Sequence, residues 1–139
     1  MLALNPTVVR FGDQVWEDVT ALAIDRAAER AVEHWGDLGP HAVLVDVPEQ
    51  RVTIRVVRRV TRDEPADVRP GAAADFVAYT APAGSDAARR KISAAAVAVS
   101  CRTELSERSG ATRTIELVAV SSDGAQDPVT VSDAPPGAA

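Results

Sequence analysis

Side chains that alternate between apolar and polar are the feature that most limits the fold of this chain. Within Arg51–Thr61, positions 52, 54, 56 and 60 are apolar, whereas positions 53, 55, 59 and 61 are polar. Successive side chains of a β-strand point to opposite faces, so this period of two predicts a half-buried strand. His41–Val47 is rich in β-branched residues and predicts a second strand. Pro48–Gln50 predicts a short turn that makes the two strands antiparallel neighbours.

The alternation recurs further along the chain. Ile92–Leu105 predicts a long strand, followed by a turn at Ser106–Gly110 and another strand over Thr112–Val120. One face of the long strand carries Val97, Val99, Cys101, Thr103 and Leu105, and the other carries Ala94, Ala96, Ala98, Ser100, Arg102 and Glu104. Shorter strands are predicted at Phe76–Thr80 and Val129–Val131, with a hairpin of Thr7–Phe11 and Val15–Val19. Strands joined by tight turns predict a mainly β fold, an antiparallel β-sandwich or open barrel.

Two segments contain helical signals. Val19–Trp35 is rich in alanine, and its apolar residues suit one face of an amphipathic helix, which composition favours. The alternation of Thr20, Leu22 and Ile24 with Ala21, Ala23 and Asp25 suits a strand instead, and both interpretations stay open. Ser85–Arg90 predicts one helical turn capped by Ser85 or Asp86, which is the one short helix of the expected fold.

The chain has 139 residues and a mass of 14.6 kDa, enough for one domain with its own core. We expect a single β-sandwich domain over residues 1–132 and a disordered tail over residues 133–139, where turn formers replace the apolar pattern. Asp63–Gly71 is polar and contains two prolines, and it is predicted to be a loop within the domain.

Composition and charge exclude several classes of protein. The formal net charge of -5 argues against an ordinary DNA-binding module, which usually carries a basic excess. The single cysteine, Cys101, excludes an intrachain disulfide and a cysteine-based zinc cluster. The amino-terminal residues do not have the pattern of a signal peptide, and no apolar run approaches the roughly 18 residues of a membrane helix.

The residues that commonly carry chemistry form no recognisable site. His34 and His41 are the only histidines, and we expect them to be unrelated surface or edge residues. Cys101 is predicted to be a small buried hydrophobic residue, because it follows Val99 on one face of a strand. The sequence has neither the nucleophile motif of serine hydrolases nor a phosphate-binding glycine loop. We therefore predict no catalytic, cofactor-binding or metal-binding residue, and we predict that the protein is not an enzyme.

Arginines are concentrated on the predicted strand that begins at Arg51. Arg51, Arg55 and Arg59 share one face, with Arg58 and Arg62 close by. Potential partners are Glu49, Asp63, Glu64, Glu104 and Glu116. Aromatic residues make up only 4%, so stacking platforms for bases are scarce. We expect this face to be solvated or ion-paired, with a protein–protein contact as the second interpretation.

The length of the Ile92–Leu105 strand points to assembly. It would span about 45 Å at about 3.4 Å per residue, whereas typical strands span about 17–20 Å. A hairpin that outgrows its domain exposes backbone edges, and pairing with another chain would cover them. The alternative is that a bulge breaks the strand and the chain covers it alone.

The chain resembles the tail tube proteins of long-tailed bacteriophages. The resemblance lies in residues 45–56 (VDVPEQRVTIRV) and 113–129 (RTIELVAVSSDGAQDPV), and it extends over most of residues 7–131. It implies a β-sandwich with a flanking helix or helical turn, and long strands where Val19–Trp35 lies. It also implies hexameric rings that stack into a hollow tube, with inner strands forming one continuous barrel around an acidic channel. Asp63–Gly71 and the amino-terminal stretch are the expected contacts between rings.

The function implied by this resemblance is a virion structural protein that conducts the genome during ejection. Its expected partners are further copies of itself, the tape measure, terminator and baseplate proteins, and DNA passing through the lumen without specific binding. The protein would be assembled in the cytoplasm of the host bacterium and would reside in the virion tail. Two alternatives remain: a tail terminator, adaptor or baseplate hub protein of the same fold, and a cellular β-sandwich module that binds a ligand or protein.

Overall fold

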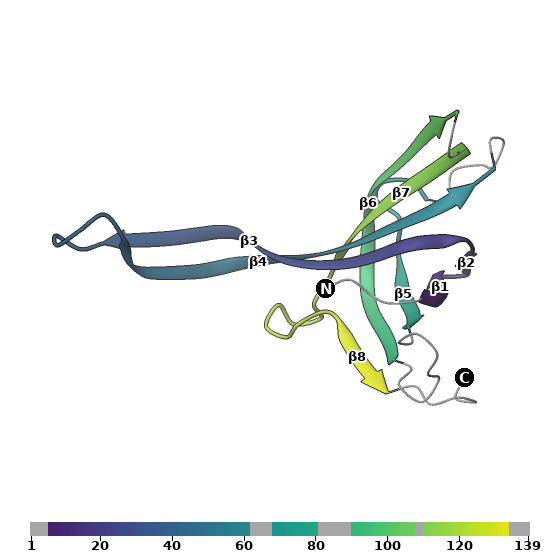
Figure 1. Cartoon of the computed structure of the whole chain (residues 1–139). Helices are drawn as coiled ribbons and strands as arrows, with labels where there is room; N and C mark the ends of the chain where they lie inside the picture. Colours follow the sequence, from purple (N-terminus) through teal and green to yellow (C-terminus); the bar gives the residue numbers. More distant parts are fainter. Residues whose placement is uncertain (1–5, 62–67, 81–89, 108–109, 134–139) are drawn as a thin grey trace.

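The computed structural model describes residues 6–61, 68–80, 90–107 and 110–133, which form eight strands (Figure 1). These are β1 (Pro6–Phe11), β2 (Gln14–Trp16), β3 (Val19–Trp35), β4 (Ala42–Val60), β5 (Ala73–Thr80), β6 (Arg90–Ser106), β7 (Gly110–Ala119) and β8 (Thr130–Asp133). The predicted mainly β, antiparallel fold is confirmed.

The predicted short helix is absent from the residues that the structure describes. Of Ser85–Arg90, residues 85–89 lie outside the described part of the chain, and Arg90 begins β6. Within the described ranges, no helix is long and apolar enough to cross a membrane. Of the predicted tail, Asp133 is the last residue of β8 and residues 134–139 are not described.

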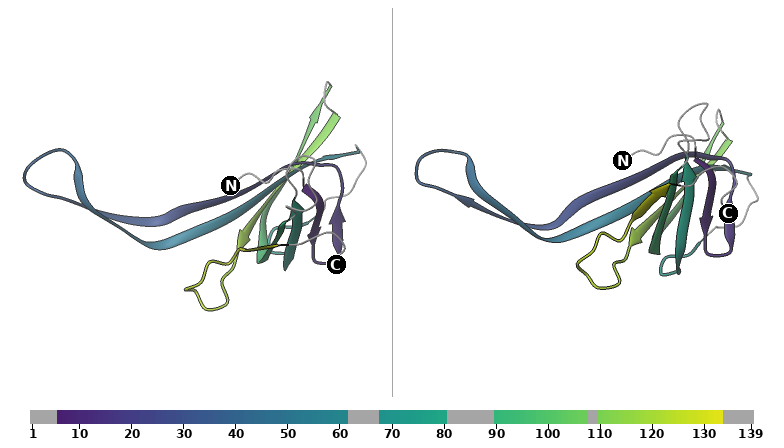
Figure 2. Two further views of the ribbon diagram at one scale, coloured as in Figure 1. Left: turned by 60° about the horizontal axis from the view of Figure 1, so that its bottom comes forward. Right: turned by 90° about the horizontal axis from the view of Figure 1, so that it is seen from below.

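The strands form one antiparallel sheet in the order β2-β1-β5-β6-β7-β4-β3, and β8 pairs with the start of β6. The sheet is strongly curved, and β1 contacts β3 although the two are not hydrogen-bonded neighbours (Figure 2). This curvature encloses the core on the concave side and gives an open barrel. The predicted amino-terminal hairpin is present as β1 and β2, with Val9 opposite Trp16, but its second strand ends at Trp16 and Val19 begins β3.

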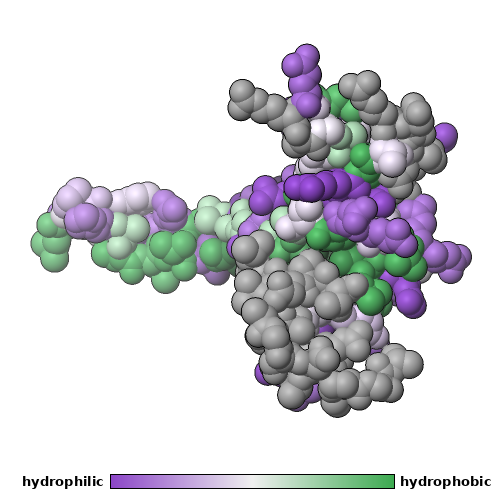
Figure 3. All heavy atoms as spheres, turned by 45° about the vertical axis from the view of Figure 1, so that its right-hand side comes forward, coloured by the Kyte–Doolittle hydropathy of each residue, from purple (hydrophilic) through white to green (hydrophobic). Residues whose placement is uncertain are grey.

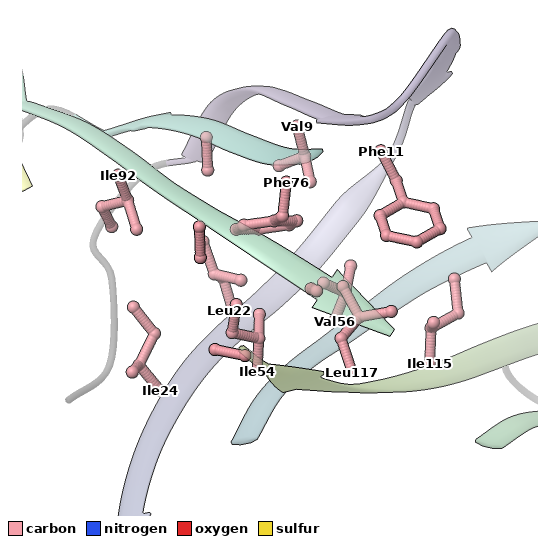
Figure 4. Close-up of a cluster of buried hydrophobic side chains, with 14 of the residues drawn as sticks. Val9, Phe11, Leu22, Ile24, Ile54, Val56, Phe76, Ile92, Ile115 and Leu117 are labelled. Carbon is pink, nitrogen blue, oxygen red and sulfur yellow. The ribbon is translucent and has the colours of Figure 1, made fainter. Parts of the chain in front are cut away.

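Large aliphatic side chains from several strands fill the concave side of the sheet (Figure 4). Fully buried members include Leu22 and Ile24 of β3, Ile54 and Val56 of β4, Phe76 of β5, Ile92 of β6, and Ile115 and Leu117 of β7. Phe11 stacks on Trp16 with a distance of 5.6 Å between ring centroids. The core therefore depends on cross-strand pairs that bring apolar side chains to the same face.

Val19–Trp35 is a strand, so the helix predicted from its composition is not formed and that prediction is wrong. Leu22 lies opposite Val56 and Ile24 lies opposite Ile54, and all four side chains are buried. These cross-strand contacts outweigh the weak preference of alanine for helix, because burial contributes more free energy than intrinsic propensity. The strand alternative, which the resemblance also implied, is confirmed.

The predicted turn at Pro48–Gln50 is also wrong, because β4 runs through it without a break. Pairing shifts from Arg30 opposite Glu49 to Val32 opposite Asp46, which places a β-bulge at Val47 and Pro48. Pairing of β4 with β7 begins only at Thr53, so β4 has one neighbouring strand at Pro48. Proline lacks an N–H donor and is tolerated at bulges and on edge strands, and for that reason it does not end this strand.

A bulge in β6 changes which residues face the core. Ala98 lies opposite Leu117, but the next pairs are Ser100 opposite Glu116 and Cys101 opposite Ile115. The extra residue, Val99, resets the alternation, because each inserted residue reverses the side on which the next side chains lie. Residues 94, 96 and 98 are consequently buried, whereas Val99 is 39% exposed. From Cys101 onward the predicted face lies on the core side of the sheet, but only Cys101 is half-buried and Leu105 is 64% exposed. Before the bulge the predicted face is wrong.

Two valines of β4 test this division of the strand into buried and exposed parts. Val56 is 0% exposed and Val43 is 73% exposed. We expect Val56→Ala to lower the free energy of unfolding by about 2 kcal/mol, through lost burial and the cavity left behind. Val43→Ala should change it by less than about 0.5 kcal/mol. Urea denaturation at concentrations where the protein is monomeric measures both, and equal losses would contradict the assigned core.

Candidate functional site

The feature that stands out from the body is a two-stranded ribbon formed by the outer parts of β3 and β4 (Figures 1 and 2). We call residues 25–51 the arm, because every residue in this range is exposed. From the Asp25–Thr53 pair to the Trp35–Ala42 pair, it extends about 35 Å at about 3.4 Å per residue. Along the arm, β3 and β4 pair only with each other, because the β4–β7 pairing starts at Thr53.

The tip and two compensating bulges fix the register of the arm. The chain reverses between Trp35 and Ala42, and the indole Nε1 of Trp35 donates a hydrogen bond of 3.2 Å to the backbone oxygen of Pro40. Pairing shifts between Ala28 and Arg30 and back between Arg30 and Val32, and a third shift lies between His34 and Trp35 next to the tip. The ribbon therefore stays paired to its tip although both strands contain irregular residues.

Exposed hydrophobic residues gather on the arm. Of the twelve large hydrophobic residues exposed in the described chain, seven belong to it: Val32, Trp35, Leu38, Val43, Leu44, Val45 and Val47. In Figure 3 the hydrophobic residues run along one side of the arm and the hydrophilic residues along the other. A soluble monomer rarely exposes so continuous an apolar surface, and such surfaces mark interaction sites.

The register separates the two faces of the outer arm. Glu33 lies opposite Val45, and strand alternation places Trp35 and Val47 on the same side; we call these four residues the apolar face. Val32 lies opposite Asp46 and His34 lies opposite Leu44, and these four residues form the mixed face. Glu33 is the only charged residue among the four that define the apolar face.

Three arginines toward the base of the arm have carboxylate partners. The Nε atom of Arg26 lies 2.9 Å from Oδ2 of Asp127, and that of Arg30 lies 3.5 Å from Oε1 of Glu49. The Arg51 guanidinium lies 3.8 Å from Glu29. By contrast, the described residues provide no ion pair for Glu33, Asp37 or Asp46 in the outer arm. Residues 31–50 contain no lysine or arginine, so the outer arm is apolar and acidic.

The segment between β7 and β8 braces the base of the arm. Asp127 accepts a hydrogen bond of 3.0 Å from the backbone N–H of Val129, and this bond, followed by the contact with Arg26, holds the pKa of Asp127 below its ordinary value. Backbone N–H groups of Gln126 and Ala125 likewise lower the pKa of Asp123. A hollow of about 610 Å³ lies here, and among the described residues its ionisable lining consists of Arg26 and Asp127. These two side chains bond to each other, so the charges in the hollow are already paired.

The structure does not bring the residues considered for chemistry together. His34 lies near the tip on β3, and His41 lies just before β4; both are exposed. Within the described ranges, no group of three or more histidine, cysteine or acidic residues is placed to hold a metal. Cys101 packs against the core but is only half-buried, so its predicted burial is partial.

The arginines of β4 separate into two groups. Arg51, Arg55 and Arg59 are exposed as predicted, and Arg51 pairs with Glu29. Arg58 points to the other side, is 6% exposed, and donates a 3.0 Å hydrogen bond to the Glu17 carbonyl. Directly opposite it in the register is Arg113, which is 3% exposed and donates to the hydroxyl of Thr103.

The arm was not predicted from the sequence. The residues Gly36-Asp37-Leu38-Gly39-Pro40 are turn formers between two segments with strand character, and this is the signal of a hairpin. The helical interpretation of Val19–Trp35 concealed one strand, and the turn expected at Pro48–Gln50 divided the other.

The chain matches no protein-family model and no curated protein sequence.

The contacts of Asp127 with Val129 and Arg26 can be tested through the pH dependence of stability. Asp127→Ala removes both the bond to Val129 and the contact with Arg26, and because both charged side chains are 41–49% exposed we expect a loss of about 1 kcal/mol or less at neutral pH. The folded pKa lies below the ordinary 3.8, so the stabilisation is complete above that value. It disappears as the pH falls through the lowered pKa.

Denaturation of wild-type protein and Asp127→Ala at pH about 7 and about 2.5 measures this difference. Ser122→Ala, in the same segment, is the matched control because Ser122 is exposed and has no side-chain bond within the described residues. A difference that persists unchanged in acid would contradict the assigned role of the Asp127 carboxylate.

Proposed function

We propose that this protein is a structural subunit that assembles with copies of itself into rings. More specifically, we propose a phage tail tube protein whose hexameric rings stack into the conduit for genome ejection. Its other partners would be the tape measure, terminator and baseplate proteins of the same tail. The subunit would assemble in the host cytoplasm and reside in the virion.

The arm is the observation that supports this proposal. An isolated two-stranded ribbon is marginally stable in water, because neither face is covered and each strand has only one neighbour. The arm projects away from the body, so its own chain does not cover it in the structure (Figure 1). A second copy would bury the apolar residues of the arm and place further strands or side chains beside it. Self-assembly would therefore account for the exposed apolar surface.

The size of the arm indicates the type of assembly. A ribbon about 35 Å long and about 10 Å wide offers roughly 350 Å² on one face, or about 700 Å² counting both partners. Stable interfaces usually bury about 1,200–2,000 Å², so one arm contact is too small by itself. In a closed ring, each copy both gives an arm and receives one, so every subunit is held by two such contacts and the ring is more stable than a single pair.

The charge of the protein is compatible with a DNA conduit. The formal net charge is -5, and the outer arm contributes acidic residues without any basic ones. Surfaces of like charge do not adhere to the phosphate backbone, so DNA would pass without being retained. This argument supports a channel and disfavours a nucleic-acid-binding function.

Deletion of the arm is the direct test. Ala27 lies opposite Arg51, so replacing residues 28–50 by Asn-Gly closes a short hairpin without altering the body. We expect wild-type protein to form rings or tubes in negative-stain images and the arm-deleted protein to remain a folded monomer. The control is thermal unfolding, which should be cooperative for both proteins.

The masses of the assemblies distinguish the proposed functions. Rings that elongate into tubes support the tail tube function, whereas discrete rings that never elongate would indicate a terminator, adaptor or hub protein. A wild-type protein that stays monomeric at every concentration would contradict self-assembly. Ligand-dependent stabilisation of such a monomer would favour the cellular binding module.

A further inference from the structure

We propose that the apolar face of the arm docks on the convex side of the sheet in a second copy, where Glu33 pairs with Arg59 and the neighbouring Arg55. This inference rests on the proposed self-assembly and specifies the surface that receives the arm. The docking would be head-to-tail, because the arm and the receiving surface are different parts of the molecule.

The receiving surface spans three neighbouring strands on the side of the sheet opposite the core. On β4, strand alternation places Val57 between Arg55 and Arg59. Val118 of β7 lies opposite Val97 of β6, and both are half-buried, as is Val57. We call these five residues the outer patch. Glu116 of β7 lies opposite Arg55 on this surface, so the positive charge is concentrated at Arg59. The patch therefore combines apolar area with a cation, which is the complement of an apolar arm that carries a carboxylate.

Charge left unpaired on each surface supports this match. Arg26, Arg30, Arg51, Arg90 and Arg102 each have a carboxylate partner. Arg55 and Arg59 have no carboxylate within ion-pair distance among the described residues, and Glu33 has no cation there. If the apolar face is buried, the Glu33 carboxylate is buried with it. An unpaired buried charge is costly, so the receiving surface must provide a cation.

The same chain cannot bring these two surfaces together. Glu33 lies opposite Val45 on β4, and Arg59 lies further along that same strand. Positions 45 and 59 are fourteen residue steps apart, which corresponds to about 48 Å at about 3.4 Å per residue. Because β4 is continuous, only the arm of another copy can place Glu33 against Arg59.

The chemistry of the arm also disfavours other occupants. Residues 31–50 contain acidic groups and no lysine or arginine, so nucleic acid and anionic lipid would both be repelled. The preferred partner is a protein surface with valines and unpaired arginines, and the outer patch of this chain is such a surface. A copy of the chain is therefore the occupant that the charges and the apolar residues favour.

A charge exchange tests the pairing. The variants are Glu33→Arg, Arg59→Glu and the double variant that contains both changes. Arg59 is preferred to Arg55 because Thr112 lies opposite Arg59, whereas Glu116 lies opposite Arg55 and would repel a new carboxylate. Asp46→Arg is the matched control, since it makes the same kind of change on the mixed face of the arm.

Mass photometry or sedimentation against protein concentration gives the concentration of half-assembly. We expect each single variant to raise it about tenfold or more, as close charge pairs at interfaces are coupled by at least that amount. The double variant should return to within about threefold of wild type, and Asp46→Arg should change it by less than about threefold. All three substituted side chains are exposed, so circular dichroism and melting of the monomer should not change.

The possible outcomes separate this inference from the proposed function. If wild-type protein assembles and Glu33→Arg assembles as well as Asp46→Arg, the docking surface is wrong and self-assembly stands. If both single variants are weakened but the double variant is not restored, the pairing of Glu33 with Arg59 is overturned. If wild-type protein remains monomeric throughout, both proposals are overturned.

Discussion

The structure depends on the antiparallel pairing of β3 with β4, which serves two different purposes along its length. Near the body, the pairs of Leu22 with Val56 and of Ile24 with Ile54 form one wall of the core. Beyond Asp25 the same ladder continues, and no other strand of the described chain lies beside it and no buried core residue beneath it. A continuous hydrogen-bonded ladder thus connects a stable body to a ribbon that has little stability of its own.

Local features of the sequence make this division possible. Arg26 and Asp127, Arg30 and Glu49 form ion pairs at the base, where the ribbon leaves the body. Further out, the bulge at Pro48 is tolerated because β4 has only one neighbouring strand there. In the outer arm, Trp35 and the β4 valines at positions 43, 45 and 47 are exposed, and Glu33, Asp37 and Asp46 have no ion pair among the described residues. The charges that are paired thus lie toward the base, and the exposed apolar surface lies toward the tip.

The strands with one buried face were predictable from the sequence, and the arm was not. Arg51–Thr61, Ile92–Leu105 and Thr112–Val120 alternate because the core lies on one side of each, and the structure has strands at all three. In the arm no core lies beneath either face, so the side chains need not alternate between apolar and polar. The alanine-rich composition of Val19–Trp35 was then the stronger signal, and it favoured a helix. The bulge at Val99 was invisible for a related reason: an extra residue reverses the faces without altering the composition of the strand.

The most direct test is hydrogen exchange of the arm amides as a function of protein concentration. In dilute monomer, amides between residues 26 and 50 should exchange fast while those of the core strands stay protected. As the protein assembles, protection of the arm should rise in step with the measured mass, and the core should change little. Arm amides that are equally protected in the monomer, or that exchange fast in every assembled sample, would contradict an arm that is completed by a neighbouring copy.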